Sequence, residues 1–411
     1  MPCGKERVLK CENAYDLQHI SETLKKVKDG TLFGFFKVDA HVPDELEEWF
    51  SEFPSLIVKA EIPEENVSIK MRDYRKATGR KKSKEGTKKL ICVMKAEKMW
   101  ANAEYLVWLL EKKIKVTAVH TMILYKEGKP FAFFPEEISK ARREADKDPA
   151  KKLAGDNKKL LGNSGVGKFI ENKEVQVYTV FNIDEEEIEK AIRSPYLADL
   201  QKINGAYEIK KRKHVVKQDR AFQCGIQIYQ TSKLHMLRFK YDFLDRFFDR
   251  EDYEYCYMDT DSAYIAVSDL NIDNIVKPEM KETLKLEKSK WLVTDKYSER
   301  SPWLFKPEFI GVRGIFLTNK CCIVQNAEGK TKNSAKGVQQ DMIFQTYKEE
   351  LELYKSLKSS EKLDYISKVT NTGFRKHNHG VIAYRQEKLG LSAYYDKRYV
   401  LEDGIHTKPL W

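Results

Sequence analysis

The sequence lacks the features that mark membrane proteins, secreted proteins and cysteine-based metal sites. No apolar run in its 411 residues reaches the roughly 18–20 residues that cross a bilayer. The N-terminal segment MPCGKERVLKCENAYDL has no apolar signal core. None of the seven cysteines lies in a CxxC pair, and the adjacent Cys321 and Cys322 do not have metal-site spacing. We therefore expect a protein with reduced thiols that is neither secreted nor bound to a membrane.

The composition is that of a globular protein with an excess of positive charge. The chain is 41% hydrophobic and 33% charged, with a net charge of +11, and is long enough for two or three domains. Such an excess favours a polyanionic partner, although a basic solvated surface would give the same count. Residues 70–89 are dense in Lys and Arg, which predicts a loop that contacts phosphates, serves as a nuclear-import signal or is only solvated. This segment favours the nucleus over the cytoplasm.

The hydrophobic pattern predicts a mixture of strands and helices. Residues 30–125 contain strand-like runs and one short amphipathic helix, from residue 103 to residue 116. Two helices, from Pro135 to Ala145 and from Pro149 onward, should form an antiparallel hairpin. A longer helix over 222–248 is apolar over so wide an arc that it should be buried under a sheet.

A β-hairpin should follow this helix and carry two acids at its tip. In YMDTDSAYIAV, residues 257 to 267, Asp259 and Asp261 would point to the same side of a strand. Two carboxylates in an open site suit Mg²⁺, which keeps waters and accepts substrate phosphates as further ligands. An EF-hand is excluded because Tyr264 and Leu270 stand where that loop needs Gly and Glu. A surface turn without function is the remaining alternative.

A second motif lies upstream, in KLLGNSGVGK from Lys159 to Lys168. Lys159, Asn163 and Val166 share one helix face, where a lysine can meet a triphosphate. The Walker pattern is excluded because Phe169 follows Lys168. A helix end weakened by glycine would look the same.

Together the two motifs resemble those of family B DNA polymerases, in the protein-primed branch of phages, linear plasmids and Maverick/Polinton-like elements. YMDTDS is similar to motif C, YxDTDS, and KLLGNSGVG to motif B, KxxxNSxYG; the resemblance covers about residues 25–411. It implies an α+β right-hand polymerase: a palm made of an antiparallel sheet with packed helices, fingers made of a helical hairpin, and a small thumb. The implied parts are a palm-associated insertion like the terminal-protein region over 1–115, fingers over 116–172, palm over 173–310 and a thumb-like region over 311–411.

The resemblance also implies roles for particular residues around the nucleotide. Asp261 would be the principal metal ligand and Asp259 an auxiliary one. Lys159 would contact the phosphates of the incoming nucleotide, and Asn163 would shape that pocket. Arg143, on the opposite helix of the fingers hairpin, is a candidate second phosphate contact.

Two further lysines are candidates for contact with DNA. Lys320, in NKCCIV, stands where the family has the KxY motif that grips the primer strand. Lys336, in SAKGV, would contact the DNA backbone. Solvated surface lysines are the alternative for both.

The chain departs from the family pattern at three places. Val166 replaces the tyrosine of motif B, and Cys322 replaces the tyrosine of KxY. Motif A, DxxSLYPS, which carries the other metal-binding aspartate, is not found in residues 1–158; Asp39 is strand-borne but has the wrong neighbours. Because MPCGKERV resembles the segment after motif A, we expect the chain to begin just past that strand, without the exonuclease region.

The expected function is that of a partial DNA-directed DNA polymerase, a nucleotidyltransferase of DNA replication that uses Mg²⁺ or Mn²⁺. Its partners would be a DNA primer-template, deoxynucleoside triphosphates and a terminal protein primer. Without motif A, we expect activity of this chain alone to be weak or nil. The alternatives are an inactive DNA-binding remnant, one piece of a split polymerase, and an unrelated Mg²⁺ phosphotransferase.

Overall fold

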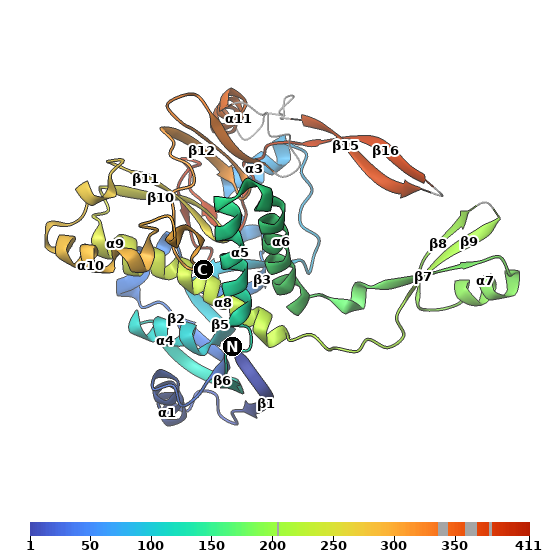
Figure 1. The fold of residues 1–411 in the computed structure, drawn as a ribbon, viewed down its shortest axis with the longest axis horizontal. Helices are drawn as coiled ribbons and strands as arrows, with labels where there is room; N and C mark the ends of the chain where they lie inside the picture. The colour runs from blue at the N-terminus through green and yellow to red at the C-terminus, as the bar shows by residue number, and fades with distance from the viewer. Residues whose placement is uncertain (204, 336–343, 358–367, 378–379) are drawn as a thin grey trace. The chain divides into compact units, whose positions relative to one another are not determined.

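The computed structural model describes all residues except 204, 336–343, 358–367 and 378–379. The chain packs into two compact units. The first comprises Met1–Lys159, Gln227–Ser367 and Leu389–Trp411, and the second Leu160–Ile226 and Lys368–Lys388. Both are mixed α/β with small antiparallel sheets (Figure 1). Whether these units contain the four expected polymerase parts stays a prediction.

The largest sheet of the first unit is antiparallel, with the strand order β1-β6-β2-β5. Its two central strands, β6 and β2, correspond to strand-like runs within residues 30–125, where branched and aromatic residues favour the extended conformation. Phe36, Val38 and Val119 are completely buried in it, and Trp108 of the expected short helix packs into the same core. The strands are β1 (Pro2–Lys10), β2 (Gly34–His41), β5 (Lys95–Asn102) and β6 (Lys115–Glu127), covered by α1 (Leu17–Lys28) and α4 (Ala103–Glu111).

The long helix expected over 222–248 is present but is not uniformly α-helical. It consists of α8 (Phe222–Arg238), a π-helix η5 (Phe239–Leu244) and a last turn α9 (Asp245–Phe247). Leu234, Leu237 and Tyr241 pack in the core of the large sheet, whereas Phe243 and Phe247 pack in a second core. The apolar face of this long helix is wide because its residues pack in two separate cores.

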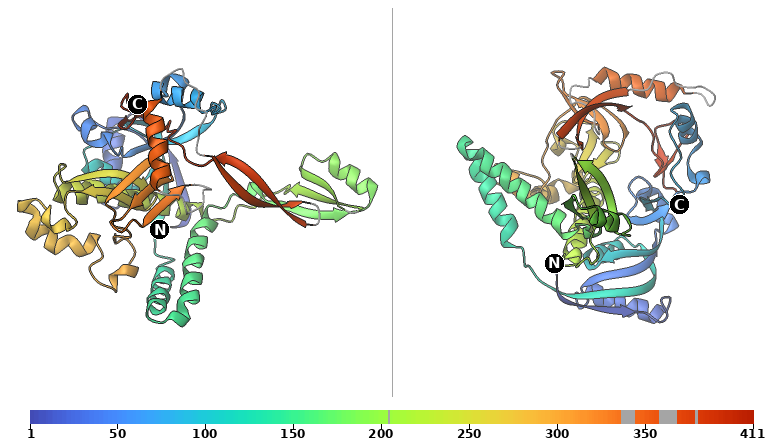
Figure 2. Two further views of the ribbon diagram at one scale, coloured as in Figure 1. Left: turned by 90° about the horizontal axis from the view of Figure 1, so that it is seen from above. Right: turned by 90° about the vertical axis from the view of Figure 1, so that its right-hand side faces the viewer.

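The expected helical hairpin is formed by α5 (Phe133–Lys147) and α6 (Lys152–Phe169), which lie side by side in both views of Figure 2. Pro149 begins a short 3₁₀ turn between them, and the Asp148 side chain accepts a hydrogen bond from the backbone N–H of Ala150. A Cβ at Gly155 would lie 2.6 Å from the Cβ of Ala145, so only glycine permits this approach of the helices.

The basic segment 70–89 is only partly a loop. Its first residues belong to α3 (Ile69–Ala77), which begins where the side chain of Ser68 accepts a hydrogen bond from the N–H of Met71. Residues 78–87 connect α3 to β4, and residues 79–88 are all exposed. The prediction of a continuous basic loop was therefore wrong, because the alternation of apolar Met71 and Tyr74 with basic residues gives a helix with a buried face.

The rest of the first unit consists of small antiparallel sheets and short helices. They are α2 (Glu47–Ser51), β3 (Leu56–Glu61) with β4 (Lys88–Val93), β10 (Tyr253–Asp259) with β11 (Ser262–Val267), α10 (Lys281–Trp291), the sheet of β12 (Arg313–Thr318), β13 (Cys321–Gln325) and β14 (Thr331–Ala335), α11 (Phe344–Ser356), and β17 (Tyr399–Val400) with β18 (Thr407–Lys408).

The second unit contains a three-stranded sheet of order β7-β9-β8 and a two-stranded one. Helix α7 packs on the first sheet through Ile188 and Ala191, against Ile209. The elements are β7 (Val177–Asn182), α7 (Glu185–Ile192), β8 (Leu197–Ile203), β9 (Ala206–Arg212), β15 (Lys368–His377) and β16 (Gly380–Leu389). Among the described residues of both units, no helix combines the length and apolar character that crossing a membrane requires.

Candidate metal and nucleotide site

The two predicted acids lie at the tip of the β10–β11 hairpin. Asp259 is the last residue of β10 and pairs with Ser262, so Thr260 and Asp261 form a two-residue turn. The Asp261 N–H donates to the Asp259 carbonyl at 2.7 Å. Asp261 therefore lies in the turn and not in a strand, so strand alternation does not determine the side to which its carboxylate points. Thr260 closes the turn with a φ of 58°, which is costly for a β-branched residue and is typical of a functional turn.

Both faces of this hairpin are fixed by packing. On one face, Met258 and Ala263 pack against the core of the large sheet. On the other face, the Tyr257 ring stacks on Phe316 of β12 and the Tyr264 ring meets Phe316 edge to face, with centroid distances of 5.8 and 5.4 Å. The turn that carries the acids therefore projects from a rigid support.

The turn between β12 and β13 brings Lys320 to the first acid. The Lys320 Nζ donates to Asp259 Oδ1 at 2.9 Å and to Oδ2 at 2.7 Å. Its backbone N–H donates to the Tyr257 hydroxyl at 2.6 Å, and its φ is 59°. The hydrogen bond with Asp259 raises the pKa of Lys320. Two candidate residues that lie 61 positions apart in the sequence are thus in direct contact.

Cys322, which replaces the tyrosine of the KxY pattern, faces away from solvent. Its side chain is buried beside Tyr264, and burial raises the pKa of the thiol. The position contributes to the support of the hairpin in this structure.

The donor set suits a weakly held divalent cation. Asp261 is exposed, and no hydrogen bond or ion pair of its carboxylate is found within the described part of the chain. Asp259 is half-buried, and its Oδ1 also accepts a hydrogen bond from the Thr260 hydroxyl at 3.1 Å. Among the described residues there is no group of three or more His, Cys, Asp and Glu side chains that could hold a metal. A bound Mg²⁺ or Mn²⁺ would therefore use these two carboxylates and take its other ligands from water and phosphate.

Asp39 is engaged elsewhere and does not add a ligand. Its Oδ1 lies 2.8 Å from Nε2 of His120 and accepts from the Lys98 N–H at 2.6 Å, and its Oδ2 accepts from the Tyr15 hydroxyl at 3.2 Å. This buried carboxylate stabilises the large sheet, since its hydrogen bonds join β2, β5, β6 and the segment before α1.

Lys159 lies on the exposed side of α6, in the first unit. No hydrogen bond or ion pair with Asp259 or Asp261 is found for it in the described regions. Its charge reaches Glu308: the pKa of that carboxyl is lowered first by the hydrogen bond from Lys332 and to a smaller extent by Lys159. Asn163, one turn further along α6, is also exposed and belongs to the second unit.

Arg143 contacts protein groups where a phosphate contact was expected. Its Nε donates to the Tyr297 carbonyl at 3.2 Å, a terminal nitrogen donates to Ser301 Oγ at 3.3 Å, and the guanidinium lies 3.9 Å from the Tyr297 ring centroid. The residue docks α5 on the segment around residues 297–301. Its role with nucleotide stays a prediction, and Lys336 lies outside the described residues.

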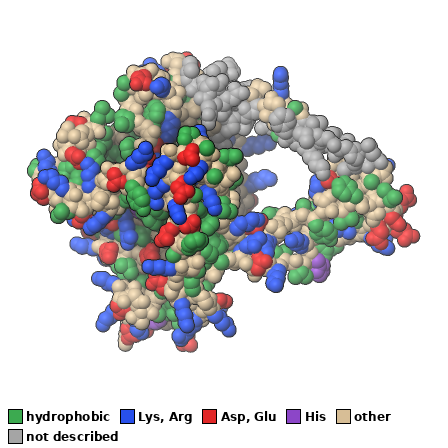
Figure 3. All heavy atoms as spheres, in the orientation of Figure 1, with side chains coloured by type: hydrophobic (Ala, Val, Ile, Leu, Met, Phe, Trp, Pro, Cys, Tyr) green, Lys and Arg blue, Asp and Glu red, His purple; other side chains and the backbone are tan. Residues whose placement is uncertain are grey.

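Sequence reasoning missed the contact between Lys320 and Asp259 and the anchoring role of Tyr257. The tyrosine that precedes the acids in YMDTDS was the available signal for an anchor. On the face drawn in Figure 3, Lys and Arg side chains are interspersed with Asp and Glu. No continuous basic patch is seen among the described residues on that face.

Comparisons with protein-family models, with curated proteins and with solved structures find no match for this chain.

Proposed function

We propose that this chain is the C-terminal portion of a DNA-directed DNA polymerase of the protein-primed family B type, with fingers, palm and a thumb-like region but without motif A. The observation that carries the proposal is the meeting of two motifs at one place: the hairpin acids of YMDTDS and the lysine of NKCCIV, in direct contact through Asp259 and Lys320. The β10–β11 hairpin has a rigid aromatic support and shares a core with the long helix α8, which is compatible with an α+β palm. The α5–α6 hairpin is compatible with fingers.

The chain's own residues would divide the work of nucleotidyl transfer. Asp261, with accessible oxygens, and Asp259 would hold Mg²⁺ or Mn²⁺. When bound, such ions neutralise charge at the reacting phosphate and activate the attacking 3′-oxygen as a nucleophile. The exposed Lys159 can meet the triphosphate, and Asn163 would line its pocket. Lys320 and Lys336 would contact the primer-template, with a terminal protein as primer at initiation.

A catalytically inactive DNA-binding remnant is the second candidate. The observation that favours it is the small donor set, two carboxylates of which one is already paired with a lysine. A third possibility is a split polymerase, in which another chain supplies the missing carboxylate strand.

A primer-extension assay with the full chain, with Mg²⁺ and then Mn²⁺, distinguishes these functions. Because motif A is not found, extension by this chain alone should be weak at most, and Asp261→Asn should lower its rate by a further factor of roughly 10–100 or more because a metal ligand is lost. DNA binding, measured by fluorescence anisotropy, should change little in the variant. The control is Asp273→Asn, which removes an exposed aspartate outside the site. Unlike Asp261, Asp273 is paired with a lysine, Lys288.

Binding of DNA without extension, even with Mn²⁺, would favour the remnant. Extension that appears only when a second chain with a motif A strand is added would favour the split enzyme. Extension that is unaffected by Asp261→Asn would contradict the proposed site.

A further inference from the structure

Both oxygens of the Asp259 carboxylate already have hydrogen-bond donors in this structure. Its Oδ1 accepts from the Lys320 ammonium at 2.9 Å and from the Thr260 hydroxyl at 3.1 Å, and its Oδ2 accepts from the same ammonium at 2.7 Å. An ammonium that bridges both oxygens occupies the place from which a divalent cation would bind that carboxylate. The two cations also repel each other, so the ammonium competes with a divalent cation for this carboxylate.

We propose that Lys320 is a resident counterion of the metal site, which must leave Asp259 before a divalent cation can use that carboxylate. The inference rests on the proposed role of Asp259 and Asp261 as ligands. In this scheme a divalent cation first binds Asp261. The site is completed when the cation replaces Lys320 at Asp259.

The local structure allows the ammonium to leave without moving the turn. The Lys320 backbone is held independently of its side chain, by the hydrogen bond from its N–H to the Tyr257 hydroxyl at 2.6 Å. Tyr257 is in turn fixed by its stacking on Phe316. The side chains of Lys320 and Asp259 are 57% and 29% exposed, so solvent can take up the released ammonium.

The neighbouring charges distinguish an exchange from a general field effect. Asp261 lies within electrostatic reach of Lys320 and contributes to its raised pKa, after the hydrogen bond with Asp259. Lys332, on β14, acts electrostatically on Cys322 but donates its hydrogen bond to Glu308, at 2.9 Å. Lys332 is therefore a nearby cation that does not occupy Asp259, and it is the matched control.

The test is the binding of Mn²⁺ alone, followed by the electron paramagnetic resonance signal of free Mn²⁺, with the full chain and without DNA or nucleotide. Lys320→Gln should raise the Mn²⁺ affinity by roughly 3- to 10-fold, because the competing cation is gone. Lys320→Arg, which keeps the charge and can keep the pair, should stay near the wild type. Lys332→Gln should change the affinity by less than about twofold.

A double-mutant cycle gives the sharper result. If Lys320 competes for the oxygens of Asp259, Lys320→Gln should have almost no effect when Asp259→Asn is already present. Circular dichroism of each variant verifies that the fold is retained.

Two results would contradict the exchange but not the metal site. One is an increase in Mn²⁺ affinity for Lys332→Gln as large as that for Lys320→Gln. The other is an effect of Lys320→Gln on Mn²⁺ affinity that persists when Asp259→Asn is present. Mn²⁺ binding that is unchanged by both Asp259→Asn and Asp261→Asn would instead overturn the metal site itself, and the exchange with it.

Discussion

A lysine–aspartate pair lies near each end of strand β10, and the two pairs differ in their surroundings more than in their geometry. Near its start, Lys240 Nζ lies 2.8 and 3.0 Å from the two oxygens of Asp245; at its end, Lys320 Nζ lies 2.9 and 2.7 Å from those of Asp259. The side chains of the first pair are 1% and 10% exposed, and those of the second 57% and 29%. Similar distances thus serve two purposes: a buried pair is fixed, whereas an exposed pair can exchange partners.

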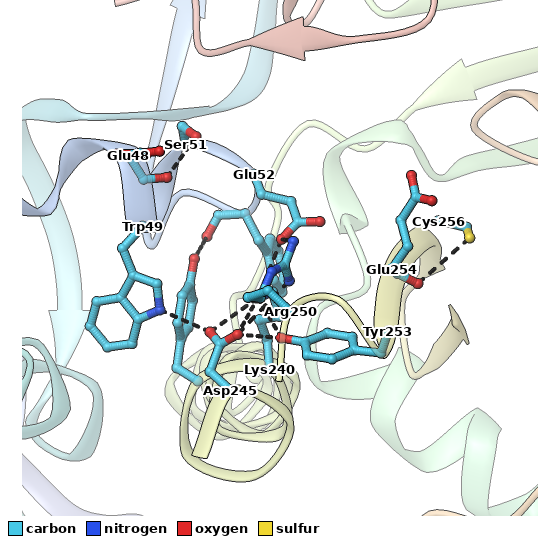
Figure 4. A network of polar contacts seen from close by, with 12 residues as sticks. Glu48, Trp49, Ser51, Glu52, Lys240, Asp245, Arg250, Tyr253, Glu254 and Cys256 are labelled. Carbon is cyan, nitrogen blue, oxygen red and sulfur yellow. Dashed lines mark hydrogen bonds and ion pairs between the residues drawn. The ribbon is translucent and has the colours of Figure 1, made fainter. Parts of the chain in front are cut away.

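The buried pair belongs to a network that joins three elements (Figure 4). Lys240, in the π-helix, also contacts Glu52 at 3.2 Å and donates to the hydroxyl of Tyr253 at 3.0 Å. Asp245 accepts from the indole N–H of Trp49 at 2.9 Å and from the Tyr253 hydroxyl. The π-helix, the segment around α2 and β10 are thereby held together. Arg250 also contacts Glu52 at 3.0 Å and Asp245 at 3.8 Å, so removing Lys240 leaves these carboxylates with fewer partners in a largely desolvated site.

The largest expected effect is that of Lys240→Met on stability. We expect a loss of about 3 kcal/mol in the free energy of unfolding, because the buried Asp245 carboxylate loses its nearest cation and keeps the more distant Arg250, at 3.8 Å. Lys320→Met removes the same groups from the exposed pair and should change stability by less than about 1 kcal/mol. Urea unfolding of both variants, followed by circular dichroism, measures the difference. Equal losses would show that burial does not distinguish the pairs.

Lys233 extends the comparison to a partly buried lysine whose ammonium is hydrogen-bonded to neutral oxygens. Its Nζ donates to the Ser55 carbonyl at 2.5 Å and to the Tyr105 hydroxyl at 2.7 Å, and no ion pair of Lys233 is found among the residues described. Burial lowers its pKa to about 7, from 10.5. Between these pH values the unfolded chain binds more protons than the folded one, so stability should rise with pH.

The measurable effect of Lys233 is therefore on the pH dependence of unfolding. From pH 7 to pH 9 its contribution should increase stability by about 2 kcal/mol, and Lys233→Met should remove that increase. Lys320→Met is the control, since an exposed lysine with a raised pKa stays charged throughout this range. Parallel pH profiles for Lys233→Met and the wild type would contradict a partly buried, neutralised lysine.

The three lysines also show where sequence reasoning stops. The hairpin with its acids, the α5–α6 pair and the long helix could be predicted, because each depends on residues close together in the chain. The contact of Lys320 with Asp259 could not, since it depends on how two hairpins pack through Tyr257 and Phe316. The π-turn at residues 239–244 has no local pattern that separates it from α-helix.

Arg143 illustrates the same limit at the candidate site. Its side chain could be placed on the correct helix, whereas its partners Tyr297 and Ser301 come from a segment about 150 residues later in the chain. The hairpin tip was predicted to carry both acids, but the sequence did not show that Asp259 ends the strand while Asp261 lies in the two-residue turn.

The smallest expected effect concerns an ion pair of intermediate exposure, between Arg300 and Asp146 of α5. Two guanidinium nitrogens lie 2.6 Å from the two carboxylate oxygens, and the side chains are 22% and 34% exposed. None of the residues of α5 is buried, so the helix depends on this pair and on Arg143 for its docking. Arg300→Gln should lower global stability by no more than about 1 kcal/mol. It should nevertheless accelerate hydrogen exchange of the α5 amides, because local opening needs less free energy than unfolding.

The matched control for Arg300→Gln is Lys190→Gln, which breaks a pair within α7, between Lys190 and Glu187, that docks nothing. Exchange in α5 should respond to the first variant and not to the second. If α5 exchange is unchanged by Arg300→Gln, the helix is held by its packing on α6 through Gly155 instead. The Arg300–Asp146 pair would then contribute as little to stability as Lys320–Asp259, although it is less exposed. In that case exposure alone would not determine how much each ion pair of this protein stabilises the fold.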